Sequence, residues 1–397
     1  MNRKFWIIAL IAFINSLSFT ILIPTIYLYG KQFGLSDFQT SLLFSIYSLA
    51  QFIATPVIGK LSDRFGRKPL LIISLAGTVI ANLIAGTATT ASLLFFARLL
   101  DGITGGNTSV AQAVISDVTN SKDRAKGFGV FGAAFGLGFI LGPVISLLAQ
   151  RISLGASFLA SSGIALFALL VTIFLLPETI EHKTERSHSI FDLGLGNLIK
   201  GIFIPKVGIL LIINFFIGTT FTIFTYAFQP YFINVLKQDN QSLTLIFILF
   251  GVLGLLMQLE GLQILTRRFN LATILFLALF IRSLSFTLMP IWSNVLYFVV
   301  VSVLFSIFNS LVQPIINTLI SLNAKPEDQG TIMGLNASYL AISNAIGPII
   351  AGMTIEQSNL SSYGHSLYLA GGLTFLVLLL AIYNRKKYTI KANPKVA

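Results

Sequence analysis

Long apolar stretches with few or no charged residues dominate the chain, and each is long enough for one or two membrane-spanning helices. Such a helix needs about 20 mostly apolar residues. The stretches are 5–30, 38–59, 69–97 with 102–116, 127–150, 152–177, 207–236, 240–259, 269–323, 329–355 and 357–384. Two of them, 69–116 and 269–323, are long enough for two helices each, with turns near 86–90 and 290–294. Twelve spanning helices are therefore predicted.

Lipid restricts what these stretches can form. A membrane-spanning segment must pair its backbone polar groups internally, which only helices and closed barrels achieve. Barrel strands are short and alternate polar with apolar residues, whereas these stretches are long and continuously apolar. The predicted fold class is an all-α membrane protein.

The second half of the chain repeats the first. Three matched features recur in corresponding helices at a spacing of 204 to 206 residues: Arg64-Phe65 with Arg268-Phe269, Gly142-Pro143 with Gly347-Pro348, and Pro24 with Pro230. We predict two parallel six-helix halves, 1–177 and 207–397, the second ending in a short basic tail. A cytoplasmic linker, 178–206, joins them. Such halves alternate access to a site between them.

Composition agrees with a bilayer environment, and the placement of charge gives the orientation. Hydrophobic residues make up 55% of the 397 positions and charged residues 10%, whereas soluble domains carry about a quarter charged residues. Twenty-one of the 26 Lys and Arg residues fall at the termini and in loops of one side, and three on the other. The positive-inside rule puts both termini in the cytoplasm. It also explains the net charge of +12 without nucleic acid.

The loop between the second and third helices carries the most specific motif, G-x-x-x-D-R-x-G-R-K, at 59–68. It resembles the signature loop of the major facilitator superfamily. The resemblance implies a latch of the transport gate, in which Asp63 faces the start of the eleventh helix and Arg67 pairs with an acid at the inner end of the fourth, here Asp117. The candidate gating residues are Gly59, Asp63, Arg64, Gly66, Arg67, Lys68 and Asp117.

The fourth helix places two charges inside a span, which is costly in lipid and by default suggests function. Arg98 and Asp101 are three residues apart and share a helix face. The segment resembles the R-x-x-x-G pattern of the same superfamily. A static ion pair that holds the helices together is the competing interpretation. Glu260, near the end of the eighth helix, is a third candidate for proton coupling, and its alternative is an interfacial pair with Arg267 or Arg268.

The fifth helix resembles the antiporter motif of that superfamily at Gly138, Gly142 and Pro143, and departs from it at Ile145-Ser146. Gly347-Pro348 repeats the pattern in the eleventh helix. Small residues let helices approach closely and proline permits a bend, so these positions are candidate hinges. Generic close packing is the alternative.

Within the superfamily the chain is most similar to the tetracycline/proton antiporter-like drug exporters. The similarity rests on four segments: Ile23-Pro24, 101–106, Gln313-Pro314 and 327–330. Those exporters carry an acid nine residues before the proline, where this chain has Asn15. Asn cannot titrate, so coupling to protons has to use Asp101 or Glu260.

The resemblance also implies which helices line a substrate cavity, and their amide and aromatic residues carry little charge. Such a lining suits an amphipathic or weakly charged compound. Hydrogen bonding between helices is the alternative role for each residue. The candidates are Asn15, Tyr47, Gln51, Asn107, Gln112, Phe135, Asn214, Tyr226, Gln229, Gln258, Asn309, Gln313, Asn317, Asn336 and Tyr339.

Enzyme and cofactor chemistry find no support in the sequence. There is no phosphate-binding Walker loop, no Cys, and the three His residues show no metal-ligand spacing. We predict a monomeric secondary transporter in a bacterial-type plasma membrane, with no cofactor or metal, that exports small drug-like compounds by proton antiport. Two alternatives stay open: a transporter of one metabolite such as a sugar or organic acid, which need not use protons, and a transporter-like sensor that does not translocate.

Overall fold

A computed structural model describes residues 3–105, 107–118, 124–179, 195–325 and 329–388. The described residues form helices joined by short turns and contain no strand. Eight helices among them are long and apolar enough to cross a membrane, and shorter apolar helices cover Phe5–Thr20 and Gly136–Gln150. The predicted all-α membrane fold is confirmed, and these helices are consistent with twelve spans. Residues 180–194 of the predicted linker lie outside the described residues.

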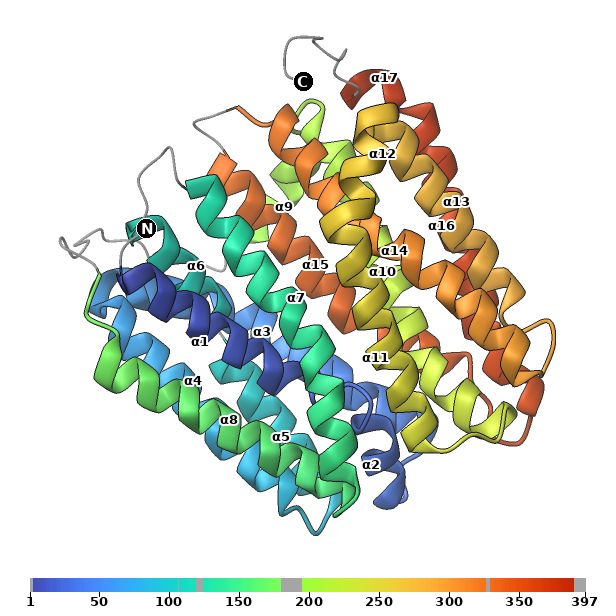
Figure 1. Cartoon of the computed structure of the whole chain (residues 1–397), viewed down its shortest axis with the longest axis horizontal. Coiled ribbons are helices and arrows are strands. Elements are labelled where there is room, and N and C mark those ends of the chain that lie inside the picture. The colour runs from blue at the N-terminus through green and yellow to red at the C-terminus, as the bar shows by residue number, and fades with distance from the viewer. Residues whose placement is uncertain (1–2, 106, 119–123, 180–194, 326–328, 389–397) are drawn as a thin grey trace. The chain divides into compact units, whose positions relative to one another are not determined.

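The described residues of the first compact unit form α1 to α8 and the first part of α11 (Figure 1). Its pairs α4 with α8, α1 with α7, and α3 with α5 pack along each other. Polar caps begin several of these helices, and Ser36 and Gln39 form a reciprocal capping box at the start of α3. The helices are α1 Arg3–Thr20, α2 Ile26–Gln32, α3 Asp37–Phe65, α4 Arg67–Gly86, α5 Ala91–Thr104, α6 Asn107–Val118, α7 Arg124–Gln150 and α8 Leu154–Leu175.

The second unit holds the remaining helices, and α10 packs against α15 and α16 while α13 packs against α14 and α16. Residues 238–251, which include the first part of α11, belong to the first unit, so the units depart from chain order at this segment. The elements are α9 Leu195–Ile202, α10 Val207–Pro230, a π-helical turn Tyr231–Val235, α11 Asn240–Leu256, a π-helical turn Met257–Gly261, α12 Leu262–Arg268, α13 Leu271–Leu288, α14 Val295–Asn323, α15 Gln329–Met353, a 3₁₀ turn Leu360–Gly364, α16 His365–Tyr383 and α17 Arg385–Tyr388.

Two of the predicted spans are interrupted. The first consists of α1 and α2, separated by a turn at 21–25. In this turn the N–H groups of Leu22, Ile23 and Thr25 bond to carbonyls three residues earlier, for example Ile23 N to Thr20 O. Pro24 explains the interruption, because it has no N–H to continue an α-helix. The fourth span consists of α5 and α6, and Gly105 caps the end of α5.

The sequence repeat reappears as a repeated packing contact. In the first unit Thr20 Oγ1 of α1 donates to the Gly138 carbonyl of α7 at 2.7 Å. In the second unit Thr222 Oγ1 of α10 donates to the Ser343 carbonyl of α15 at 3.0 Å. Positions 138 and 343 each precede a Gly-Pro pair by four residues.

The glycines of those Gly-Pro pairs lie where the paired helices touch. A Cβ at Gly142 would collide with Thr20, and one at Gly347 would collide with Thr222. A Cβ at Gly138 would likewise meet Ser16. Pro143 and Pro348 lie inside α7 and α15. Close packing of each pair therefore requires glycine, and the hinge role of the prolines stays a prediction.

Candidate functional site

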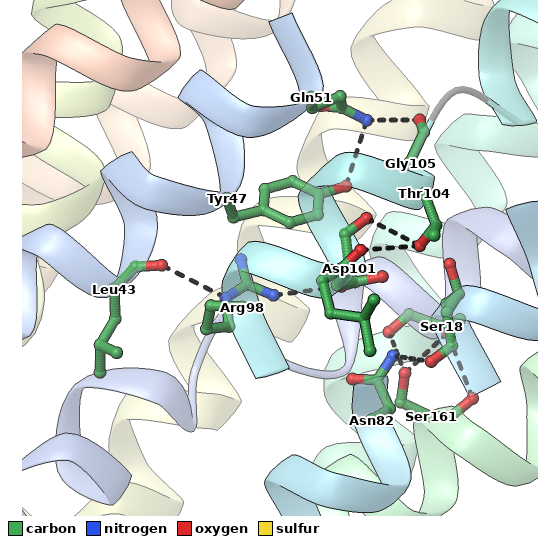
Figure 2. A network of polar contacts seen from close by, with 12 residues as sticks. Ser18, Leu43, Tyr47, Gln51, Asn82, Arg98, Asp101, Thr104, Gly105 and Ser161 are labelled. Atoms are coloured by element: carbon green, nitrogen blue, oxygen red, sulfur yellow. Dashed lines mark hydrogen bonds and ion pairs between the residues drawn. The ribbon is translucent and has the colours of Figure 1, made fainter. Parts of the chain in front are cut away.

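A buried polar network joins α3 and α5 in the first unit (Figure 2). Arg98 and Asp101 of α5 form an ion pair, with Nη1 and Oδ2 3.3 Å apart. Arg98 also donates from Nε to the Leu43 carbonyl of α3 at 3.2 Å, and its guanidinium lies 4.2 Å from the centre of the Tyr47 ring. The i, i+3 spacing that predicted the pair therefore brings the two charges together, and α3 supplies two further partners for the cation.

An amide extends this network to the end of α5. Gln51 donates from Nε2 to the Tyr47 hydroxyl at 3.2 Å and to the Gly105 carbonyl at 2.9 Å (Figure 2). Gly102 explains how α3 and α5 come close enough, because a Cβ there would meet the Tyr47 carbonyl and Ala50. The network thus connects the charged pair to the break between α5 and α6.

The pair is nearly removed from solvent. Arg98 is 5% exposed and Asp101 is 7% exposed. The Thr78 side chain of α4 hydrogen-bonds to the Asp101 carboxylate. Isolated charges in such a place would be very unfavourable, and each ion is supported by its partner and by hydrogen bonds. A change in the protonation of Asp101 would therefore change the partners of Arg98.

A second ionic cluster lies at the loop between α3 and α4. Arg67 forms an ion pair through Nη1 with Asp63 and through Nε with Asp117 of α6, the latter at 3.1 Å. Its Nη1 also donates to the Ser62 hydroxyl at 2.7 Å. Arg67 and Asp117 are thus paired as the resemblance implies. The role of the pair in gating stays a prediction.

Sequence reasoning missed Glu178, which follows α8. Its carboxylate accepts from the backbone N–H groups of Arg67 at 3.0 Å and Lys68 at 3.2 Å. It therefore satisfies the first turn of α4, where a negative charge is favourable. Gly66 turns the chain here with a φ of 116°, a conformation natural to glycine.

Three further positions of the loop differ in their surroundings. Lys68 Nζ donates to the Ile173 carbonyl at 2.8 Å, so this cation fixes the end of α8. Arg64 is exposed and lies over the Phe65 ring. Gly59 has open space where a Cβ would lie, so packing among the described residues does not explain its glycine.

In the second unit the structure brings together four of the predicted cavity residues. Asn214 of α10, Asn336 of α15, and Gln313 and Asn317 of α14 form a chain of amides. Gln229 is fully buried on α10, and its Oε1 has no partner among the described residues. Amides that are buried on α10 and α15 and half-buried on α14 thus gather in this unit.

Other predicted positions lie elsewhere. Tyr339 donates to the Leu198 carbonyl of α9 at 2.6 Å, so its hydroxyl holds that short helix. Gln258 and Glu260 are exposed in the π-helical turn Met257–Gly261. Asn309 is half-buried on α14.

Among the remaining predicted cavity positions, Tyr226 is fully buried on α10 and Asn15 is half-buried on α1. The side chains of Asn107 and Phe135 lie outside the described residues. That these residues line a substrate cavity stays a prediction.

Gln150 at the end of α7 was also missed. Its Nε2 donates to the hydroxyls of Thr25 and Ser146, each at 2.9 Å. Its Oε1 accepts from Asn240 at 2.8 Å and Thr244 at 3.4 Å, both at the start of α11. All four hydrogen-bonding positions of the amide are used. Gln150 thus fixes the first turns of α11 on the first unit.

Asp239, just before α11, accepts from the Ser242 backbone N–H at 2.9 Å. Hydrogen bonds from the Ser242 side chain and backbone hold the pKa of Asp239 below its usual range. The acid therefore stabilises the start of the helix in its charged form.

Solved structures share this fold. The human organic anion transporter TETRAN matches with a TM-score of 0.73 at 21% identity, over 96% of this chain and 99% of that one. The nucleoside transporter NupG matches with a TM-score of 0.75 at 16% identity, over 98% of this chain and 100% of that one. At these identities the likeness concerns the fold alone.

Curated relatives extend the comparison to sequence. The class C tetracycline resistance protein of Escherichia coli is 29% identical over 86% of this chain and 85% of its own. The class B protein of the same species is 29% identical over 95% and 92%. The quinolone resistance protein NorA of Staphylococcus aureus (strain COL) is 24% identical over 90% and 91%. The predicted similarity to the tetracycline exporters is confirmed.

The model of the Major Facilitator Superfamily matches residues 8–262 and 210–397. The two matches overlap at 210–262 and together reach across nearly the whole chain. They agree with the apolar helices, and the family's members move small molecules across membranes. This integral membrane protein belongs to the Major Facilitator Superfamily.

Proposed function

We propose that the protein exports small amphipathic organic compounds across a bacterial-type plasma membrane, as a monomer with both termini in the cytoplasm, in exchange for protons. Family membership supports transport, and relatives named for tetracycline and quinolone resistance support drug-like cargo. The observation that carries the coupling is the buried ion pair of Arg98 and Asp101.

Asp101 is the acid best placed to take up a proton inside a span. Asp37 and Asp101 are the two buried acids of the described residues. Asp37 is the first residue of α3 and pairs with Lys31 at 3.0 Å, whereas Asp101 lies within α5. Glu260 is exposed. Because Asn15 stands where the related exporters carry an acid, we assign the exchangeable proton to the Asp101 carboxylate.

Protonation of Asp101 would loosen the pair without leaving Arg98 unsupported. The cation keeps its hydrogen bond to the Leu43 carbonyl and its contact with the Tyr47 ring. Both partners belong to α3, so the neutral state favours contacts with α3 over the bond within α5. Loss of the proton restores the bond to Asp101. Two arrangements with different protonation are what coupling requires.

Gln51 offers a path from this change to the helix break. It bonds the Tyr47 hydroxyl and the Gly105 carbonyl together. A shift of Tyr47 with Arg98 would therefore act on the residue where α5 ends. In this proposal α6, with Asp117 near its end, moves relative to α5 as protons bind and leave.

Internal pH in proteoliposomes tests the proposal. Purified protein is exposed to tetracycline and a panel of lipophilic amines, and wild type is compared with Asp101→Asn and Glu260→Gln. Glu356→Gln is the matched control, because Glu356 is exposed and lies outside both helices that form the network. We expect a compound to trigger proton movement in wild type, Glu260→Gln and the control, and none in Asp101→Asn.

The outcomes separate transport from coupling. If a labelled compound moves but protons do not, export stands and the antiport is wrong. If only Glu260→Gln loses proton movement, the exchangeable proton belongs to that residue. If no compound moves, drug export is refuted, and a dedicated metabolite becomes the better hypothesis.

A further inference from the structure

The amide chain of the second unit has a direction. Asn214 Nδ2 on α10 donates to Asn336 Oδ1 on α15 at 2.6 Å, and Asn336 Nδ2 donates to Asn317 Oδ1 on α14 at 3.0 Å. Gln313 Nε2, one turn earlier on α14, donates to the same Asn317 oxygen at 3.2 Å. That oxygen therefore accepts two hydrogen bonds, its full capacity.

Two polar atoms remain available where the amide chain reaches α14. Asn317 Nδ2 and Gln313 Oε1 make no hydrogen bond within the described part of the protein, and both side chains are half-buried. Residues four apart share a helix face. The amide chain thus presents one donor and one acceptor side by side on α14.

The presence of one donor and one acceptor on α14 does not depend on how the amides are oriented. Reversing every amide would exchange the donor and the acceptor on α14 and keep one of each. It would also leave a buried N–H of Asn214 without a partner in place of its oxygen. Inside a protein, a buried carbonyl oxygen without a partner is tolerated better than a buried N–H without one. The amide orientations of the structure are therefore favoured over the reversed ones.

Asn214, the buried end of the amide chain, argues against a purely structural role for these amides. Asn214 is 0% exposed, and its Oδ1 has no partner among the described residues. Such an atom is unfavourable, and an apolar side chain would pack at this point without that penalty. The amide is useful because it holds Asn336, which in turn holds Asn317.

We infer that Gln313 and Asn317 form a recognition subsite for a neutral carboxamide, or for another planar group with a carbonyl beside an N–H or O–H. The inference rests on the proposed function, because it names a chemical group of the exported compound. The carbonyl of the ligand accepts from Asn317 Nδ2, and its N–H donates to Gln313 Oε1. Asn336 and Asn214 are positioning residues.

The same pair of atoms disfavours charged groups. A carboxylate would place one oxygen against Gln313 Oε1, and an ammonium group would place its N–H bonds against Asn317 Nδ2. Selectivity against such groups arises from these repulsive contacts as much as from the attractive ones. The subsite therefore selects neutral polar groups on an otherwise apolar compound.

Binding of two matched probes tests the inference. Tetracycline carries a carboxamide, and its nitrile analogue keeps the ring system but lacks the N–H groups. Dissociation constants are measured by equilibrium dialysis with purified protein at fixed pH and Mg²⁺. We expect wild type to bind tetracycline on the order of tenfold tighter, the effect of about one hydrogen bond. Gln313→Met and Asn317→Leu should each bring the ratio to about one.

The affinity for the nitrile analogue distinguishes loss of a ligand contact from a general packing defect. If the amides act on the ligand, the variants weaken tetracycline and leave the nitrile unchanged, whereas a packing defect weakens both equally and overturns the inference. Asn323→Ala is the matched control, because Asn323 is the last residue of α14 and lies outside the amide chain. Should a variant fail to fold, the double substitution Gln313→Asn with Asn317→Gln is used instead. It keeps two amides on α14 but shifts the donor and the acceptor that would contact the ligand.

The inference and the proposed function fail in different ways. Equal binding of both probes by wild type, with transport of both, overturns the subsite and leaves export standing. Binding of neither probe refutes export of this class, and the inference falls with it.

Discussion

Among the described residues, Arg98 and Arg282 are the two buried arginines, and we expect them to respond to mutation in different ways. Arg98→Met removes the partner of Asp101, which is 7% exposed and 3.3 Å from the guanidinium. The carboxylate is then buried without a counter-charge. Breaking a buried ion pair in this manner costs about 3–5 kcal/mol. A second substitution, Asp101→Leu, removes the stranded charge and should recover most of the loss.

Arg282 on α13 provides the contrast. It is 1% exposed, and its Nη2 donates to the Ile217 carbonyl at 2.7 Å and to Thr220 Oγ1 at 2.8 Å. Its guanidinium lies 5.9 Å from the centre of the Phe221 ring and 5.3 Å from the centre of the Phe286 ring. Arg282→Met loses two charge-assisted hydrogen bonds, about 1.5–3 kcal/mol each. It also removes the desolvation of a buried cation, several kcal/mol, so a net change within about 1 kcal/mol is expected.

Thermal unfolding in detergent measures both effects. The chain has two Trp residues and no Cys, so intrinsic fluorescence is used in place of a thiol-reactive dye. We expect a fall in Tm of about 5 °C for Arg98→Met and a change of less than about 2 °C for Arg282→Met. The deficit of Arg98→Met should shrink as pH falls, because protonation neutralises the stranded Asp101.

Three results would refute this reasoning. Equal losses in the two variants would mean that the stranded carboxylate does not determine the penalty. A deficit in Arg98→Met that Asp101→Leu fails to relieve would assign the loss to the contacts with Leu43 and Tyr47. A deficit that grows as pH falls would contradict the sign of the electrostatic argument.

Three further predictions concern other polar contacts. Asp117→Asn should slow transport about fivefold, because the ion pair of Arg67 and Asp117 in the proposed latch contributes about 1 kcal/mol at this exposure. Initial transport rates in proteoliposomes measure the effect, with Asp117→Glu as the control. Gln150→Leu should lower Tm by about 2 °C or more, because the partners of the amide, Asn240 among them, lose their hydrogen bonds; an unchanged Tm would contradict this. Because its pKa is lowered on folding, Asp239 should stabilise the protein above its usual pKa and lose that effect as pH falls through the lowered value; Tm of Asp239→Asn against wild type across pH measures it.

The positions of the helices could be predicted because lipid penalises charge along the whole length of a span. The helix interruptions could not be predicted by the same rule. Hydropathy averages over a window, so it treats the turn at Pro24 and the cap at Gly105 as continuous apolar chain. Each interruption depends on where single backbone groups find partners, Ile23 N with Thr20 O for example. That is a local matter that composition does not record.

The candidate site divides in a similar way. Arg98 and Asp101 could be paired from sequence because both lie on one helix at a fixed spacing. Glu178 could not be placed, because its carboxylate reaches N–H groups 110 and 111 residues earlier in the chain. In the sequence, an acid directly after the last apolar residue of a span indicates the start of a linker. Only the packing of α8 against α4 brings it to the first turn of α4.

The two units share a packing scheme but differ in their buried polar groups. A threonine bonds a backbone carbonyl four residues before Gly-Pro in each unit, which preserves the repeat where helices touch. The first unit buries an ion pair within α5, and Arg98 of that pair also bonds to the Leu43 carbonyl of α3. In the second unit, α10, α14 and α15 are joined by uncharged amides. A buried ion pair responds to protonation, whereas amides bind neutral polar groups. Divergence after duplication would therefore give proton coupling to the first unit and recognition of the exported compound to the second. Substitutions in the amide chain should therefore change which compounds bind and leave the number of protons exchanged per compound unaltered.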